Sequence, residues 1–271
     1  MRIGVLAASS RTNPAAIAKI TAYAASAFPE VELVFHPQCL ETDGHFAGSD
    51  FRRAAAFLEY ANDPAFDALW FLRGGYGANR ILAMVMPELG RAARHKTYLG
   101  YSDVGFLLGA LYARRIGRPA HGPLVSDIQR DDGDTTVTRA LGWMVERDTR
   151  GLEPSIGKHP VAAFNLSILA AMIGSQWLPD LTDHVLMIEE ISEPLYRVDR
   201  MLFTMAHATQ LKGIAGVRLG RIGDIQPNDP PWGETPEAMI VRWCAEMKVP
   251  YLGRADIGHD AGNKVVPFGY A

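Results

Sequence analysis

A serine at the end of a predicted strand is the first residue whose setting suits chemistry. Gly100-Tyr101-Ser102-Asp103 follows a short strand expected at 98–100, and an apolar helical pattern starts at Val104. A sharp turn between strand and helix can expose a nucleophilic hydroxyl, while the next backbone N–H helps to hold an oxyanion. Val104 stands where the usual Gly-x-Ser-x-Gly pattern has its second glycine. Helix capping is also a common role for serine, and the local pattern leaves both roles open.

A glycine-rich turn lies at the end of another predicted strand. Arg73-Gly74-Gly75-Tyr76-Gly77 follows an apolar run at 68–72 and precedes a helical pattern at 78–85. Glycines let backbone N–H groups point at an anion or oxyanion. The spacing is not that of a dinucleotide-binding turn, and a purely structural turn is the alternative.

A nucleophilic serine needs a base and usually a carboxylate that orients the base. Of the eight histidines, only His259 stands in a polar loop with neighbouring glycines, at 256–263. Glu189-Glu190 closes an apolar strand at 185–188, and adjacent strand residues point to opposite faces. One carboxylate can therefore enter a cleft while the other meets solvent or a basic partner. A surface histidine and a strand end emerging into water are the plain alternatives.

The elements that must position these residues alternate between strand and helix in the first half. We expect a parallel sheet covered on both faces, of flavodoxin-like or Rossmann-like type. In such sheets ligands sit outside the carboxyl ends of the strands, where both turns fall. The expected strands span 3–7, 31–35, 68–72 and 98–100, and the expected helices span 14–28, 49–62, 78–85 and 104–115.

The second half has a different pattern. A polar stretch over 127–151, with a helix at 137–146, predicts the end of the first domain and a linker. Residues 1–150 should form an N-terminal α/β domain with the candidate serine, and residues 151–271 a smaller α+β or barrel-like domain with the candidate glutamate and histidine. The second domain is expected to contain helices at 166–173 and 198–206, a strand at 185–189 and short strands around 213–223.

Composition narrows the class of protein. The 271 residues, 48% hydrophobic and 21% charged, predict a globular chain with a sizeable core, and a net charge of -3 argues against nucleic acid as a partner. The first apolar run is too short for a signal peptide, and no apolar run is long enough to span a membrane. Cys39 and Cys244 lack partners at metal-binding spacing, so neither a disulfide framework nor a zinc site is expected. A soluble cytoplasmic protein is predicted.

Together these segments resemble the serine LD-carboxypeptidase family, which includes muramoyltetrapeptide carboxypeptidases and related self-immunity peptidases that destroy peptide-nucleotide antibiotics. The resemblance covers nearly the whole chain in order. Its segments are Ala47-Gly48-Ser49-Asp50 with Arg52 and Arg53, Arg73-Gly74-Gly75-Tyr76-Gly77, Gly100-Tyr101-Ser102-Asp103, His121-Gly122-Pro123, Asn165-Leu166-Ser167, Glu189-Glu190 with Tyr196-Arg197-Val198-Asp199-Arg200, and Gly258-His259 with Asn263.

The resemblance implies a catalytic triad in which Ser102 is the nucleophile, His259 the general base and Glu189 the orienting carboxylate, contributed by two domains that meet at a cleft. It implies oxyanion donors at the backbone N–H groups of Gly75 and Asp103. Tyr76 and Asn165 are the implied substrate contacts, and no metal or cofactor is required. The chain departs from the family in having Glu190 for an aspartate and Phe164 for a glycine, and it looks short for the family.

The implied reaction is hydrolysis of the L,D peptide bond in tetrapeptide stems of recycled muropeptides, with release of terminal D-alanine during cell-wall recycling. The resemblance also favours a homodimer. Two alternatives stay open: an immunity-type peptidase or amidase acting on peptide-nucleotide or other conjugates, and a binding module without turnover. The conjugate alternative needs an aromatic side chain that stacks on a base; Trp232 in Pro230-Pro231-Trp232-Gly233 is the candidate, with a surface turn as its plain alternative.

Overall fold

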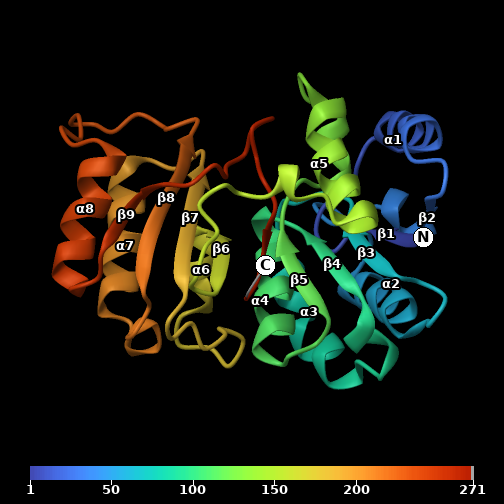
Figure 1. Cartoon of the computed structure of the whole chain (residues 1–271), viewed down its shortest axis with the longest axis horizontal. Helices are drawn as coiled ribbons and strands as arrows, with labels where there is room; N and C mark the ends of the chain where they lie inside the picture. Colours follow the sequence, from blue (N-terminus) through green and yellow to red (C-terminus); the bar gives the residue numbers. More distant parts are fainter. Residues whose placement is uncertain (270–271) are drawn as a thin grey trace.

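The computed structural model describes residues 1–269, which form two β-sheets lying side by side (Figure 1). The first sheet has the strand order β10-β5-β4-β3-β1-β2, and only the pairing of β10 with β5 is antiparallel. Its strands are β1 (Arg2–Leu6), β2 (Glu32–Phe35), β3 (Ala68–Phe71), β4 (Thr97–Gly100), β5 (Arg118–His121) and β10 (Val266–Pro267).

Helices cover both faces of the first sheet, as expected for parallel strands whose central members are buried on both sides. Every residue of β3 and β4 is buried. Helices α1 and α5 share one apolar cluster with the sheet, while α2, α3 and α4 share the cluster on the other face. The helices are α1 (Pro14–Ala27), α2 (Asp50–Asn62), α3 (Ala78–Val85), α4 (Gly105–Ala113) and α5 (Gly133–Glu146).

The second sheet is parallel throughout, in the order β6-β7-β8-β9. Helices pack on one of its faces, while the last part of the chain, including Ala255 and Val266, packs on the other. The two-domain α/β architecture is therefore confirmed, and the second domain is an open parallel sheet rather than an α+β or barrel-like unit. Its elements are β6 (Val161–Asn165), α6 (Leu166–Met172), β7 (Val185–Ile191), α7 (Leu195–His207), β8 (Gly216–Gly223), α8 (Pro236–Met247) and β9 (Tyr251–Arg254).

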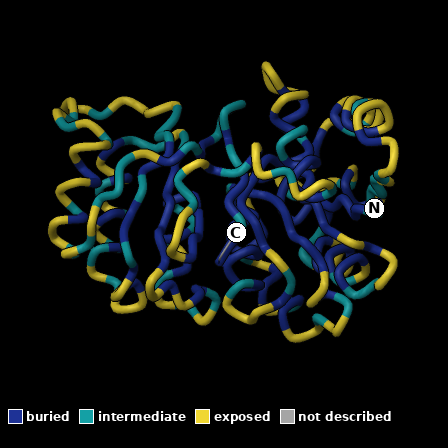
Figure 2. Tube along the Cα trace, viewed as in Figure 1, coloured by how far each residue is buried: buried dark blue, intermediate teal, exposed yellow. Residues whose placement is uncertain are grey.

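One apolar cluster contains buried residues from both domains, and in Figure 2 the strands and the helix faces of each domain are largely buried. Helix α4 packs against α6, and a Cβ added at Gly109 would lie only 2.5 Å from the Met172 side chain. Small residues on α4 thus let the helices approach closely and set the position of one sheet relative to the other. The division at residues 150 and 151 stays a prediction; strand β10 belongs to the second half but pairs with β5 of the first sheet.

No α-helix within residues 1–269 has the length and hydropathy that a membrane crossing requires.

Short 3-10 helices connect several of these elements. The 3-10 helices are η1 (Pro37–Leu40), η2 (Met86–Glu88), η3 (Ala92–His95), η4 (Ser102–Val104), η5 (Val125–Gln129), η6 (Thr149–Gly151) and η7 (Thr209–Leu211).

Candidate active site

Ser102 lies just beyond the carboxyl end of β4, at the first position of η4. Its backbone φ is 61°, in the left-handed region that L-residues other than glycine rarely occupy. Helix α4 begins without a side-chain cap, and its N-cap residue is Val104. Helix capping therefore does not account for Ser102, and the strained turn instead points its side chain into a pocket.

The glycine-rich turn after β3 packs directly against this serine. A Cβ at Gly74 would lie 2.9 Å from both Cβ and Oγ of Ser102. Gly75 has φ 124°, and a Cβ there would collide with the hydroxyl of Ser10. Only glycine satisfies both positions, so the turn brings backbone rather than side chains to the serine.

Asp103 ties the two turns together. Its side chain is 1% exposed, and one carboxylate oxygen accepts hydrogen bonds from the Ala78 N–H, at 2.8 Å, and from the Ser9 hydroxyl. Burial raises the pKa of Asp103, although these hydrogen bonds act in the opposite direction. The contact with Ala78, the first residue of α3, holds the glycine turn in place relative to Ser102.

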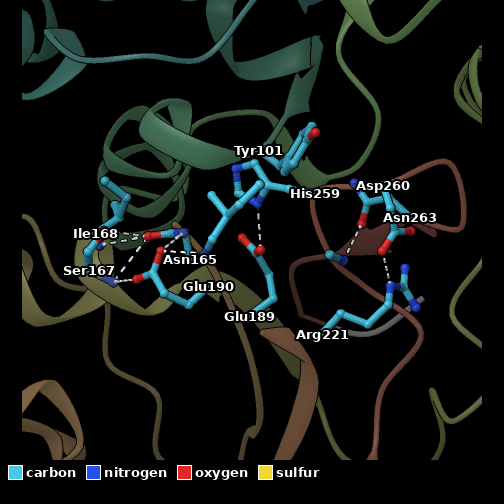
Figure 3. A network of polar contacts seen from close by, with 12 residues as sticks. Tyr101, Asn165, Ser167, Ile168, Glu189, Glu190, Arg221, His259, Asp260 and Asn263 are labelled. Carbon is cyan, nitrogen blue, oxygen red and sulfur yellow. Dashed lines mark hydrogen bonds and ion pairs between the residues drawn. The ribbon is translucent and has the colours of Figure 1, made fainter. Parts of the chain in front are cut away.

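Glu189 and His259 meet across the gap between β7 and the loop after β9 (Figure 3). The Nδ1 of His259 donates to Glu189 Oε2 at 2.6 Å, and the glutamate side chain is fully buried. Burial by itself would lower the pKa of His259, but the Glu189 charge and hydrogen bond outweigh it and raise that pKa. Since Nδ1 carries the proton in this bond, Nε2 is the nitrogen available as a base in the neutral ring.

Charged side chains from both domains hold the His259 loop. Arg221 on β8 pairs with Asp260 (Figure 3). It also pairs with Asp256, at 2.6 Å. From the first domain, Nη1 of Arg130 donates to the His259 carbonyl oxygen at 2.8 Å. The loop is therefore fixed on either side of the histidine.

A buried neutral histidine supports the same loop. Burial lowers the pKa of His121 to about 4, and its Nε2 lies 3.1 Å from Asn263 Oδ1. That amide oxygen also accepts the Gly258 N–H at 3.2 Å. The His259 ring in turn packs against Tyr101, with ring centroids 4.7 Å apart. These contacts restrict both the backbone and the ring of His259.

Ser102 and His259 line one pocket of about 190 Å³. No side-chain hydrogen bond joins them within the described residues, as is common in unliganded active sites, where such bonds tighten on substrate binding. The pocket is lined by Arg73, Gly74, Gly75, Tyr101, Ser102, Leu124, Ser126, Asp127, Arg130 and His259. The structure thus brings Ser102, His259 and Glu189 to one place, with Gly75 beside them.

Glu190 points away from this pocket, as the strand alternation predicts. Its carboxylate accepts hydrogen bonds from the Asn165 side chain and the Ser167 N–H, both at 2.7 Å. It meets the N-terminus of α6 rather than solvent or a basic side chain, an arrangement favoured by the helix dipole. Asn165 is buried and caps α6 through its side-chain oxygen. Asn165 therefore lies outside the pocket-lining set.

Tyr76 stands 49% exposed at the edge of the glycine turn, with its ring centroid 6.2 Å from that of Phe46. It does not line the Ser102 pocket. Trp232 is partly buried against the main apolar cluster. It is also absent from the residues that line the Ser102 pocket.

Comparisons with known proteins agree with this arrangement. A family model described as the LD-carboxypeptidase N-terminal domain matches residues 3–122, and one described as the LD-carboxypeptidase C-terminal domain matches residues 160–271. The chain belongs to the LD-carboxypeptidase family. A relative from Streptomyces coelicolor is 30% identical over 84% of this chain and 75% of its own length. The murein tetrapeptide carboxypeptidase of Pseudomonas aeruginosa is 26% identical over 83% of this chain and 78% of its own.

Solved structures of this LD-carboxypeptidase fold superpose over nearly the whole chain. The muramoyltetrapeptide carboxypeptidase from Oxalobacter formigenes gives a TM-score of 0.82 at 23% identity, covering 99% of this chain and 93% of that one. Wild-type microcin C7 self-immunity protein MccF gives 0.80 at 19% identity, covering 99% and 91%. At these identities the likeness shows the fold.

Several residues at the site were not singled out by sequence reasoning. Arg130 and Asp127 lie in the polar stretch interpreted as a linker, yet both line the pocket. Arg221 had no local signal, because its partners lie 35 and 39 positions away. For the first two, the charged residues of that polar stretch were the only local hint, because no strand was predicted beside them.

Proposed function

We propose that this LD-carboxypeptidase family member is a serine peptidase that hydrolyses the L,D bond preceding the terminal D-alanine of muropeptide tetrapeptides. The observation that carries the proposal is the buried Glu189–His259 hydrogen bond beside a strained serine that shares a pocket with His259. The substrate class follows from the family and from the relative named as a murein tetrapeptide carboxypeptidase. Ser102 is the nucleophile, His259 the base and Glu189 the orienting group.

The reaction proceeds by acyl transfer. His259 Nε2 takes the hydroxyl proton as Ser102 Oγ attacks the carbonyl carbon of the scissile bond, and the oxyanion forms against the backbone N–H groups of Gly75 and Asp103. The imidazolium then gives its proton to the amine of D-alanine, which leaves. Water attacks the acyl-enzyme, His259 accepts a proton from that water, and the shortened peptide departs as Ser102 regains its hydrogen.

Glu189 contributes in two ways to this cycle. Its hydrogen bond holds the proton on Nδ1, so that Nε2 faces the reaction, and its charge stabilises the imidazolium that forms. The raised pKa of His259 reflects the second effect. A cytoplasmic location, a role in peptidoglycan recycling, a homodimeric state and a substrate contact at Tyr76 stay predictions.

The direct test is release of D-alanine from the tetrapeptide L-Ala-D-Glu-meso-diaminopimelate-D-Ala in the presence of a chelator. Wild type should release D-alanine, and Ser102→Ala should lose roughly 10⁴-fold or more in kcat. Ser26→Ala, an exposed serine on α1, is the matched control and should keep wild-type activity. A fluorophosphonate should label wild type and the control but not Ser102→Ala.

Equal release by wild type and Ser102→Ala would refute the nucleophile. No release by a folded wild type would refute the muropeptide substrate. In that case hydrolysis of acylated nucleotide conjugates, or tight binding of the tetrapeptide without turnover, would identify which of the two alternative functions applies.

A further inference from the structure

Two cationic side chains, Arg73 and Arg130, line the pocket that contains Ser102, and Arg130 is already paired with a carboxylate. Each guanidinium nitrogen of Arg130 already donates: to Asp127, to the His259 carbonyl and to the Tyr101 hydroxyl, at 2.8, 2.8 and 3.2 Å. Arg73 donates only to the carbonyl oxygen of Arg11, at 3.3 Å. No carboxylate within residues 1–269 pairs with Arg73, and its side chain is exposed. The pocket therefore contains an arginine with unused donors.

The backbone places this arginine close to the reacting group. Arg73 follows the carboxyl end of β3 and directly precedes Gly74, whose backbone packs against Ser102. One residue of an extended peptide spans at most ~3.6 Å. A carboxylate on the residue after the scissile bond would thus lie within one residue length of the carbonyl carbon attacked by Ser102. An arginine side chain can bridge the remaining distance and bind a carboxylate through two parallel hydrogen bonds.

The size of the pocket fits a short leaving group. Its volume of about 190 Å³ is below the ~300–1,000 Å³ of sites that bind drug-sized ligands. This part of the site can hold one small residue, and the adjoining pocket that shares Arg73 leaves further space beside it.

We infer that Arg73 binds the free terminal carboxylate of the substrate and so restricts cleavage to the last residue. The inference rests on the proposed function and adds a specificity-determining residue to it. The competing role for Arg73 is recognition of a carboxylate within the stem peptide, because Arg73 also lines an adjoining pocket with Thr12 and Asn13.

The test crosses two changes, one in the enzyme and one in the substrate. The tetrapeptide is compared with its terminal D-alaninamide, which has the same shape but no terminal charge. Wild type should prefer the acid in kcat/KM by about 10- to 150-fold, the range for a hydrogen bond to a charged group. Arg73→Gln should reduce kcat/KM for the acid by a similar factor, change the amide little, and so abolish the preference.

Arg91→Gln is the matched control for loss of charge. Arg91 is exposed and precedes β4, at the opposite end of the strand from Ser102. It should keep the wild-type preference for the acid. A tetrapeptide with isoglutamine in place of D-Glu tests the competing role, and it should be affected by Arg73→Gln as strongly as the parent peptide.

Two outcomes would overturn the inference. One is an Arg73→Gln variant that retains the full preference for acid over amide. The other is an Arg73→Gln variant whose kcat/KM falls equally for acid and amide but does not fall for the isoglutamine peptide. Arg73 would then bind the D-Glu carboxylate within the stem peptide.

A binding measurement keeps the test independent of turnover. In a Ser102→Ala background, calorimetry should show that Arg73→Gln weakens binding of the acid but not of the amide. If wild type proves inactive on muropeptides, the proposed substrate fails, while this binding difference still supports or refutes the carboxylate site.

Discussion

Replacing Glu189 by glutamine should separate the electrostatic role of this residue from its shape. The carboxylate is fully buried and accepts the His259 Nδ1 proton at 2.6 Å, so the substitution removes one charge while keeping a side chain of the same size. A charge pair about 4 Å apart is worth about 4 kcal/mol at an effective dielectric constant of about 20. The imidazolium that forms during attack would lose that stabilisation. We therefore expect kcat to fall by roughly 10³-fold.

The pH dependence should change in a direction that the structure specifies. Attack requires neutral His259, so the acidic limb of kcat/KM follows the His259 pKa in the free enzyme. Glu189 raises that pKa against the effect of burial. Without the charge, burial dominates and lowers the pKa, and the acidic limb should move to lower pH.

The assay is D-alanine release from the tetrapeptide across pH 5 to 9, with Glu190→Gln as the matched control. Glu190 is the adjacent buried carboxylate, but it contacts the start of α6 instead of the histidine. It also raises the His259 pKa by its charge, so its replacement should move the limb in the same direction and by less. The reasoning would be refuted if Glu189→Gln lost less than tenfold in kcat and left the acidic limb of the kcat/KM profile where it is in wild type. Glu189 would then not be what raises the His259 pKa.

Two further predictions concern neighbouring groups. Gly74→Ala places a methyl group 2.9 Å from Ser102 Oγ and should lower kcat at least about 100-fold in steady-state assays, with an unchanged circular dichroism spectrum; near-normal activity would contradict the close packing. In the folded protein the pKa of His121 is about 4, against its ordinary value of 6.5. Between these pH values the unfolded state binds more protons, so the free energy of unfolding should fall by roughly 3 kcal/mol as pH falls from about 6.5 to about 4. Urea unfolding at pH 7 and 4.5 should show that His121→Gln removes most of this loss whereas exposed His95→Gln does not; equal pH dependence in both variants would show that His121 is not its source.

Much of the first sheet followed from local sequence. The strands expected at 3–7, 31–35, 68–72 and 98–100 all formed, because each is a short apolar run bounded by turn residues. Strand β5 was not expected, since its four residues include an arginine, a proline and a histidine. Strand β10 is only two residues long and exists because β5 lies beside it. Helix α8 was also not expected, although Met239, Ile240 and Cys244 have the spacing of one buried helical face.

The arrangement of the second domain was harder to predict than its individual elements. Its strand at β7 and its helices at α6 and α7 were expected, but the parallel order of the sheet depends on pairing between segments far apart in the chain. Local pattern does not reveal which strands pair or in which direction, because the paired strands lie far apart in the sequence.

The sequence by itself predicted a sharp turn at Ser102 and the adjacent glycine turn, because strand, turn and helix signals there are local, while the left-handed backbone at Ser102 was found in the structure. It also placed two carboxylates on opposite faces at the end of β7. Only the tertiary structure decided which histidine meets Glu189, since the residues alone gave His259 no more than a polar loop and 70 positions separate the pair. The same holds for Arg130, which reaches His259 across 129 positions. Contacts of this range depend on how the domains pack at α4 and α6, and that packing is a property of the whole folded chain.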